Sequence, residues 1–292
     1  MAEVEKNPTG PLGDGPPPVW IPAPAGHIIP VRRFGAGGTL RPVVLVHGLQ
    51  SHSGWFVQAA RRVASIGHNV YAFDRCGSGL STAEGDPGRE LAGLVEEIDA
   101  VATHALSESV RTSVYLLAYC FGALPALLYA ALYRPERVAG VVLATPAFFT
   151  RPQLPLRSQG RVVWSVLSRR PRRIGLPFLP HHFSELDPFI KSIRDDPLAL
   201  WEVPARLLFE ARRARARLPQ AARALQTPLL VAMAGDDPIC DNRRNRRLLH
   251  SVRAPVELHE YAGARHILEF SRQREAFLGD LAAWLKRHEE LR

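Results

Sequence analysis

The stretch Tyr115-Leu-Leu-Ala-Tyr-Cys-Phe-Gly-Ala-Leu-Pro125 decides how this chain of 292 residues folds. It starts with a short apolar run of the kind that forms a buried strand, and a helical pattern over residues 121–133 follows directly. Between the two lies Cys120, with the small residues Ala118 and Gly122 on either side. The stretch therefore predicts a strand, a sharp turn that carries the Cys120 thiol, and a helix.

The composition is that of an ordinary globular protein, with 46% hydrophobic and 22% charged residues, and the length fits one large domain with an insertion. No apolar run approaches the roughly 20 residues that a transmembrane helix needs, so no transmembrane segment is expected. Residues 1–18 are polar and rich in Pro and Gly. They lack the basic and apolar segments of a secretory signal, and the expected location is therefore cytoplasmic.

Three cysteines, Cys76, Cys120 and Cys240, are scattered along the chain and form no C-x-x-C pair. Their odd number and spacing are not typical of a disulfide framework or a zinc site, so we expect no metal and no other cofactor. Free thiols fit a reducing compartment. Cys76 and Cys240 lack the setting of Cys120 and are interpreted as structural residues.

The formal net charge is +9, and much of the excess lies in arginines between Arg157 and Arg217 and in residues 243–247. One interpretation is a solvated surface. The other is attraction to an acidic partner such as an acyl or peptidyl carrier protein, a CoA phosphate or a membrane surface. No helix-turn-helix, zinc-finger or RNA-stacking motif accompanies the charge, so no nucleic acid partner is expected.

Short apolar runs alternate with helical patterns along most of the chain, which predicts an α/β fold with a mostly parallel central sheet flanked by helices. The expected strands are residues 43–46, 69–73, 114–118, 141–144, 229–233 and 256–261, and the expected helices are 91–106, 121–133 and 276–288.

Two segments depart from this alternation. Residues 1–26 contain two proline clusters and are predicted to form a flexible leader. Residues 146–226 separate two core strands and are rich in Pro, Arg and aromatic residues, which predicts a cap or lid insertion. Residues 27–145 and 227–292 would then form the core.

Candidate partners for Cys120 follow later strands. A nucleophile on such a turn is expected to be followed in the chain by an acid and then a base, each after the carboxyl end of a later strand. Asp236, Asp237 and Asp241 follow the strand at 229–233, and His266 follows the last strand. We choose Asp237 as the acid because it follows a Gly-containing turn and precedes Pro-Ile, and His266 as the base.

An oxyanion hole needs two backbone N–H groups, and we place them at Phe121, directly after the nucleophile, and at Leu49, in the turn after the first core strand. His47 in that turn is interpreted as a structural hydrogen-bonding residue. The helix N-terminus after Cys120 and an imidazolium at His266 would both favour the thiolate.

With these motifs in place, residues 40–290 resemble the α/β-hydrolase superfamily, and within it the monoacylglycerol-lipase and lysophospholipase-like group, also classed with serine aminopeptidases. The resemblance rests on the segments 46–53, 73–81, 118–122, 194–198, 235–241 and 263–267. It implies a triad of Cys120, Asp237 and His266. The chain departs from the family pattern at residues 118–122, the sharp turn called the nucleophile elbow, where Ala118 replaces the usual first Gly and Cys120 replaces the nucleophilic Ser.

The thiol favours an acyltransferase or thioesterase that forms an acyl-cysteine intermediate from carrier-protein-bound or CoA-bound acyl groups. A thiolate attacks a thioester nearly isoenergetically, so the acyl-enzyme stays a good donor. One alternative is a carboxylester or lipid hydrolase of the monoacylglycerol-lipase type with a Cys nucleophile. Two further alternatives are a non-catalytic binding protein with the same fold and an engineered protein in which Cys120 replaces a serine.

Overall fold

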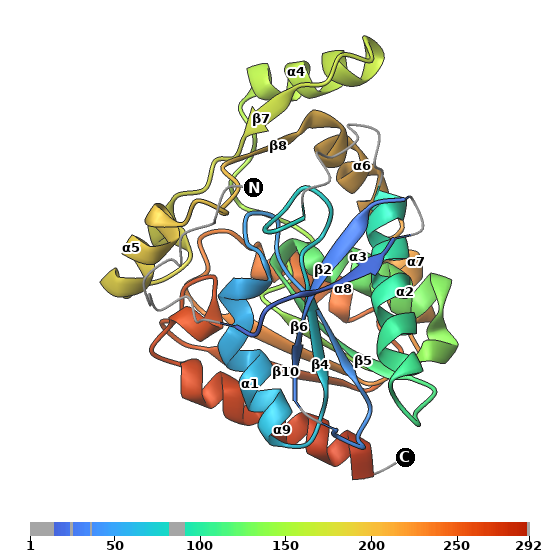
Figure 1. Cartoon of the computed structure of the whole chain (residues 1–292). Helices are drawn as coiled ribbons and strands as arrows, with labels where there is room; N and C mark the ends of the chain where they lie inside the picture. Colours follow the sequence, from blue (N-terminus) through green and yellow to red (C-terminus); the bar gives the residue numbers. More distant parts are fainter. Residues whose placement is uncertain (1–14, 24–25, 36, 82–90, 291–292) are drawn as a thin grey trace.

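The computed structural model describes residues 15–23, 26–35, 37–81 and 91–290. These form a twisted sheet of eight strands in the order β1-β2-β4-β3-β5-β6-β9-β10 (Figure 1). The strands from β4 to β10 in this order run parallel, while β1 and β2 are antiparallel. The strand bounds are β1 Val19–Pro22, β2 Ile28–Phe34, β3 Val43–Val46, β4 Val70–Phe73, β5 Val114–Tyr119, β6 Val138–Ala144, β9 Leu229–Ala234 and β10 Val256–Tyr261.

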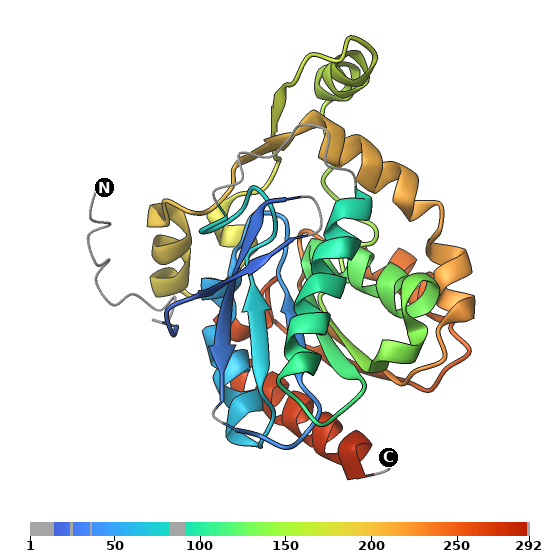
Figure 2. The same cartoon turned by 45° about the vertical axis from the view of Figure 1, so that its right-hand side comes forward.

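Helices cover both faces of the sheet (Figures 1 and 2). The first face carries α1 Val57–Ser65 and α9 Arg274–Glu290, and the second carries α2 Leu91–Ser107, α3 Ala123–Leu128, α7 Leu218–Ala224 and α8 Asn242–Leu249. Shorter helical turns are η1 Ser53–Phe56, η2 Cys120–Gly122, η3 Tyr129–Tyr133, η4 Pro135–Arg137, η5 Pro180–His182 and η6 Leu268–Phe270. The predicted α/β-hydrolase fold, a mostly parallel sheet between helices, is confirmed.

The register of the parallel strands brings the predicted site residues to one edge. Strands β3, β4, β5, β6 and β9 are buried along their whole length, as expected for strands covered on both faces. Val46 at the end of β3 pairs with Ala118 of β5. Ala234 at the end of β9 pairs with Tyr261 of β10. The loops after these strands therefore meet at the carboxyl edge of the sheet.

The chain before residue 27 differs from the predicted flexible leader. Residues 1–14 and 24–25 lie outside the described part, but Val19–Pro22 forms β1, which pairs with β2. The prediction is wrong for these residues because Ile21 packs with Ile29 in the core, while the strand stays at the sheet edge, where proline is tolerated.

The segment between β6 and β9 contains α4 Leu156–Leu167, β7 Arg173–Gly175, α5 Asp187–Asp195, β8 Glu202–Pro204, α6 Ala205–Arg215 and α7. Figures 1 and 2 show α4 projecting from the body of the protein, whereas α7 packs on α3 and α8. Residues 146–226, which we call the insertion, thus contain both an outlying part and a part of the helical layer. Asp196, directly after α5, links the insertion to the core, because its carboxylate accepts a hydrogen bond from Trp55 Nε1 at 2.6 Å.

Across the described ranges, no helix has the length and apolar character that crossing a bilayer requires.

Candidate active site

Cys120 stands at a strained turn between β5 and α3. Its φ angle is +52°, in the left-handed region that a non-glycine residue seldom occupies. Gly122 makes this turn possible, because a Cβ there would lie 2.5 Å from the carbonyl oxygen of His47 and 2.7 Å from that of Val46. The turn therefore packs against the end of β3, which holds Cys120 at the carboxyl edge of the sheet.

Asp237 and His266 form a buried hydrogen-bonded pair. His266 Nδ1 lies 2.9 Å from Asp237 Oδ2 and 3.1 Å from Oδ1, and both side chains are almost fully buried. Asp237 Oδ1 also accepts hydrogen bonds from the backbone N–H groups of Ile239 and Cys240, at 2.8 and 2.9 Å. Of the three candidate acids, Asp237 is the one that contacts His266, while Asp236 is exposed and Asp241 caps α8.

This pairing shifts the pKa values of both groups. Burial alone would raise the pKa of Asp237, but His266 and the two backbone donors outweigh it and lower the pKa below its ordinary value. Burial alone would lower the pKa of His266, but the charge of Asp237 and its hydrogen bond to the imidazole outweigh burial and raise this pKa well above its ordinary value. The pair is suited to hold a proton on the imidazole.

Cys120 and His266 line the same small cavity, of about 20 Å³, with Gly48, Ser51 and other residues around them. This volume holds about one water molecule. His266 Nε2 is buried and has no hydrogen-bond partner among the described residues, Cys120 Sγ included. The structure therefore brings the predicted nucleophile and base to one cavity without a direct hydrogen bond, as is common when no substrate is bound.

Cys240 lies closer to His266 than the sequence analysis expected. Its Sγ is 3.7 Å from His266 Nδ1 and donates to the carbonyl oxygen of Thr145 at 3.3 Å. Burial raises the pKa of the Cys240 thiol far above its ordinary value, and the charge of Asp237 adds to this effect. The thiol thus stays protonated beside the imidazole, which fits the structural role predicted for it.

The loop after β3 lies directly against the nucleophile. A Cβ on Gly48 would be 3.5 Å from Cys120 Sγ. Leu49 and Phe121, the predicted oxyanion donors, both line a larger cavity together with Cys120. The Leu49 N–H donates to no other backbone group in the described ranges. The positions of Leu49 and Phe121 are compatible with the predicted oxyanion hole.

Arg75 braces this loop and was missed by the sequence analysis. It is buried, and its guanidinium donates to the carbonyl oxygens of Gly48 and Leu49. His47 Nδ1 donates to the Gly48 carbonyl oxygen at 2.8 Å, and its Nε2 accepts from the backbone N–H of Arg75 at 3.1 Å. Burial, then the charge of Arg75, lowers the pKa of His47 to about 3, so the imidazole is neutral. The structural role predicted for His47 is confirmed.

A second polar contact missed by the sequence analysis lies behind the nucleophile. The Tyr119 hydroxyl donates to Glu269 Oε1 at 2.7 Å, and the Ala59 N–H donates to Oε2 at 3.0 Å. Burial raises the pKa of Glu269 to about 7. Tyr119 directly precedes Cys120, so this buried carboxyl supports the strand end that carries the thiol.

The larger cavity has a volume of about 440 Å³ and leads from Cys120 into the insertion. Its walls are mostly apolar, with side chains from α4 and α6 facing the loop after β6 and the start of the elbow helix. The apolar side chains that line this cavity include Val162, Val163, Leu176, Phe178, Leu208 and Ile239. A cavity of this size and lining suits a ligand with an acyl chain.

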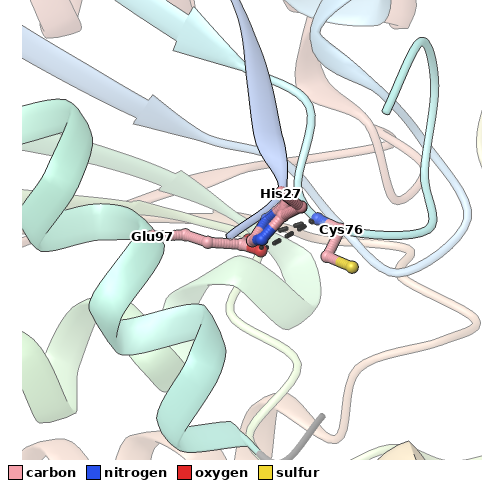
Figure 3. Close-up of side chains that lie close together, drawn as sticks. All are labelled: His27, Cys76 and Glu97. Carbon is pink, nitrogen blue, oxygen red and sulfur yellow. Dashed lines mark hydrogen bonds and ion pairs between the residues drawn. The ribbon is translucent and has the colours of Figure 1, made fainter. Parts of the chain in front are cut away.

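Away from these cavities, His27, Cys76 and Glu97 lie together, with ligand atoms within 4.8 Å of one another (Figure 3). The Glu97 carboxylate lies 2.8 Å from His27 Nε2 and accepts from the Cys76 backbone N–H at 3.2 and 3.3 Å. In Figure 3 the Cys76 Sγ is directed away from this carboxylate. The arrangement is a hydrogen-bonded link between the chain before β2, the loop after β4 and α2.

The family model of serine aminopeptidase, S33, matches residues 39–273. The chain belongs to the serine aminopeptidase S33 family. Because this match covers most of the chain, the predicted membership of the α/β-hydrolase, monoacylglycerol-lipase-like group is confirmed, and the protein is an enzyme of that fold.

Several relatives of this S33 chain are named lipases. The monoacylglycerol lipase of Mycolicibacterium smegmatis is 26% identical, over 84% of this chain and 88% of that protein. The monoglyceride lipase of Mus musculus is 24% identical, over 89% of this chain and 87% of that protein. YnbC of Escherichia coli, which is uncharacterized, is 25% identical, and the match spans only 39% of its length. The solved monoacylglycerol lipase of Paleococcus ferrophilus shares the fold, with a TM-score of 0.78, 24% identity and coverage of 89% of this chain and 99% of that one.

Proposed function

We propose that this S33-family enzyme is a carboxylester hydrolase that acts on lipid-like acyl esters, with Cys120 as its nucleophile. The observation that carries the proposal is the cavity of about 440 Å³ that Cys120 shares with Leu49 and Phe121. Its mostly apolar walls suit an acyl chain. The relatives named monoacylglycerol and monoglyceride lipases support the same substrate class. They favour the hydrolase alternative over the acyltransferase or thioesterase that the thiol alone predicts.

In the first half of the proposed reaction, His266 Nε2 takes the proton of Cys120 and the sulfur attacks the ester carbonyl carbon. A carbon–sulfur bond forms, and the N–H groups of Leu49 and Phe121 stabilise the negative charge on the carbonyl oxygen. Asp237 keeps the imidazolium in place. The carbon–oxygen bond to the alcohol then breaks, and the alcohol leaves with the proton from His266.

In the second half, His266 takes a proton from a water molecule, and the resulting hydroxide attacks the acyl-cysteine carbonyl carbon. The carbon–sulfur bond breaks and releases a carboxylic acid. The Cys120 sulfur recovers a proton from His266, which returns the enzyme to its starting state. The cavity of about 20 Å³ beside Cys120 and His266 has room for this one water.

The thiol itself supports a second candidate, acyl transfer. An acyl-cysteine is a thioester, which is a better acyl donor than a serine ester, so a carrier-protein or CoA thiol could take the acyl group instead of water. The arginine-rich insertion would attract an acidic carrier protein.

One experiment compares the two candidates. The enzyme is given a nitrophenyl ester and the acyl-pantetheine thioester of the same chain length, and free acid and transfer product are quantified with and without added pantetheine. Hydrolysis requires turnover of the ester to free acid that pantetheine does not divert, and intact-mass spectrometry should find the acyl group on Cys120. If the enzyme does not turn over the ester but turns over the thioester rapidly, the hydrolase proposal is refuted and acyl transfer is favoured.

A further inference from the structure

Two arginines at the end of α6 lie at the larger cavity. Arg212 and Arg215 both line the cavity that Cys120 also lines. The other polar side chains around it are neutral, and no carboxylate among the described residues lines it. The lining of the cavity therefore includes the Cys120 thiol, several apolar side chains and two guanidinium groups.

Neither cavity arginine has an acidic partner among the described residues, whereas their neighbour does. Arg213, which does not line the cavity, pairs with Glu210 at 3.4 Å and has 68% of its side chain exposed. Arg212 is also exposed. Arg215 is partly buried, and its Nε is buried without a hydrogen-bond partner in the described ranges. Its nearest charges are those of Arg244 and Arg212, which are also positive.

This arrangement is unfavourable as it stands. A buried donor without an acceptor costs free energy, and adjacent like charges repel each other. Burial, followed by the charges of Arg244 and Arg212, lowers the pKa of Arg215. The position in the last turn of α6 offsets part of this cost, because cations are favoured at a helix C-terminus. An anion in the cavity would offset the repulsion among the positive charges of Arg212, Arg215 and Arg244.

We propose that Arg212 and Arg215 form a subsite for an anionic group, a carboxylate or a phosphate, on the substrate whose acyl carbon reacts at Cys120. The proposal rests on the hydrolase function proposed above and narrows its substrate class. Arginine is suited to both anions, since its planar guanidinium can donate two parallel hydrogen bonds to their oxygens.

The apolar part of the cavity lining narrows the rest of the proposed substrate. The side chains of Val162, Leu208 and Ile239 are apolar and offer no hydrogen bond. The substrate is therefore an amphipathic ester with an apolar segment between the scissile carbonyl and a negatively charged end, rather than an uncharged acyl ester.

The test compares two esters of equal chain length, nitrophenyl hexanoate and the mono-nitrophenyl ester of adipic acid, which differ in a terminal carboxylate. The wild-type enzyme should favour the charged ester in kcat/KM by about 10-fold or more at low salt, as expected for charge-assisted hydrogen bonds. The preference should decrease as salt is added. Arg212→Gln combined with Arg215→Gln should remove it, while Arg213→Gln, a matched exchange outside the cavity, should preserve it.

Binding provides a second measurement that does not depend on the variants. Hexanoate, hexyl phosphate and hexanol are compared as competitive inhibitors of the neutral ester with the wild-type enzyme. An anion that competes at least about 10-fold better than hexanol supports the subsite, and the stronger of the two identifies carboxylate or phosphate as the preferred group.

The failures of the two proposals are distinguishable. If the wild-type enzyme turns over the neutral ester but shows neither a preference for the charged ester nor tighter inhibition by the anions, only the subsite is overturned. A preference that survives in the double variant would also overturn it. If neither ester is hydrolysed, the hydrolase function itself fails.

Discussion

Asp237 and His266, at the carboxyl edge of the sheet, are almost completely buried. In α4 of the insertion, by contrast, Trp164 is 60% exposed and Leu167 is 74% exposed. The first region is fixed by hydrogen bonds and close backbone packing, and the second has few buried side chains of its own. In the proposed mechanism, the carboxyl edge of the sheet supplies the reacting groups in a set geometry, and the insertion supplies the surface for the substrate. Substitutions in the two regions should therefore have different effects.

The largest effect is expected at the nucleophile. Cys120→Ala removes the atom to which the acyl group bonds, so kcat for a nitrophenyl ester should fall by about 10⁴-fold or more. Cys76→Ala, the same exchange at a thiol outside both cavities, should keep the wild-type rate. Substantial ester turnover by the Cys120 variant would remove Cys120 from the mechanism.

The next effect is expected at the acid. Asp237→Asn should lower kcat/KM by about 10²–10⁴-fold, because the amide cannot stabilise the imidazolium that forms at His266. The pKa of Asp237 lies below its ordinary value. Its carboxylate therefore contributes stability that is present above an unfolded-state pKa of about 3.9 and is lost as the pH falls through the lower folded value. Acid unfolding of the Asn variant should lack this contribution, as measured by circular dichroism from neutral pH downward.

The packing of the elbow is tested by Gly122→Ala. The added methyl group would meet the carbonyl oxygens of His47 and Val46, so the free energy of unfolding should fall by about 2–3 kcal/mol. Gly279→Ala in α9 is the matched control, since its Cβ meets no atom within 4 Å. There, helix propensity should increase stability by up to about 1 kcal/mol. Equal effects at the two glycines in urea unfolding would contradict the close packing of the elbow.

The role of Glu269, which accepts a hydrogen bond from Tyr119 next to Cys120, can be tested by measuring stability as a function of pH. The folded-state pKa of Glu269 is about 7, above an unfolded value of about 4.3. Since the folded state then holds the proton more tightly, stability should decrease as the pH rises between these values, by at most about 4 kcal/mol. Glu269→Gln should remove this slope in the free energy of unfolding. Glu275→Gln, at an exposed carboxylate, should retain it.

The smallest effect is expected on the insertion. Leu167→Ala on α4 should change the free energy of unfolding by less than about 0.5 kcal/mol, because this side chain is mostly exposed. Leu281→Ala on α9, the same exchange in the core, should cost about 2–5 kcal/mol. A large loss at Leu167 would show that α4 packs more firmly than its exposure indicates.

The sequence by itself determined the fold class and the chain order of Cys120, Asp237 and His266. It could do so because parallel strands end at one edge, so residues that follow them meet whatever their separation in the chain. The choice of Asp237 among three acids also followed from local pattern, and the structure pairs it with His266. The strand β1 was missed because its proline-rich surroundings obscured a short apolar run.

Only the tertiary structure decided which groups support these residues. Arg75 donates to carbonyl oxygens of the loop after β3, Glu269 accepts from the Tyr119 hydroxyl, and Arg215 lines the larger cavity with no acidic partner among the described residues. None of these contacts has a sequence signature, because each joins segments far apart in the chain through side-chain packing. Periodicity shows which face of an element is buried, but the partner on the other side depends on how the elements pack together.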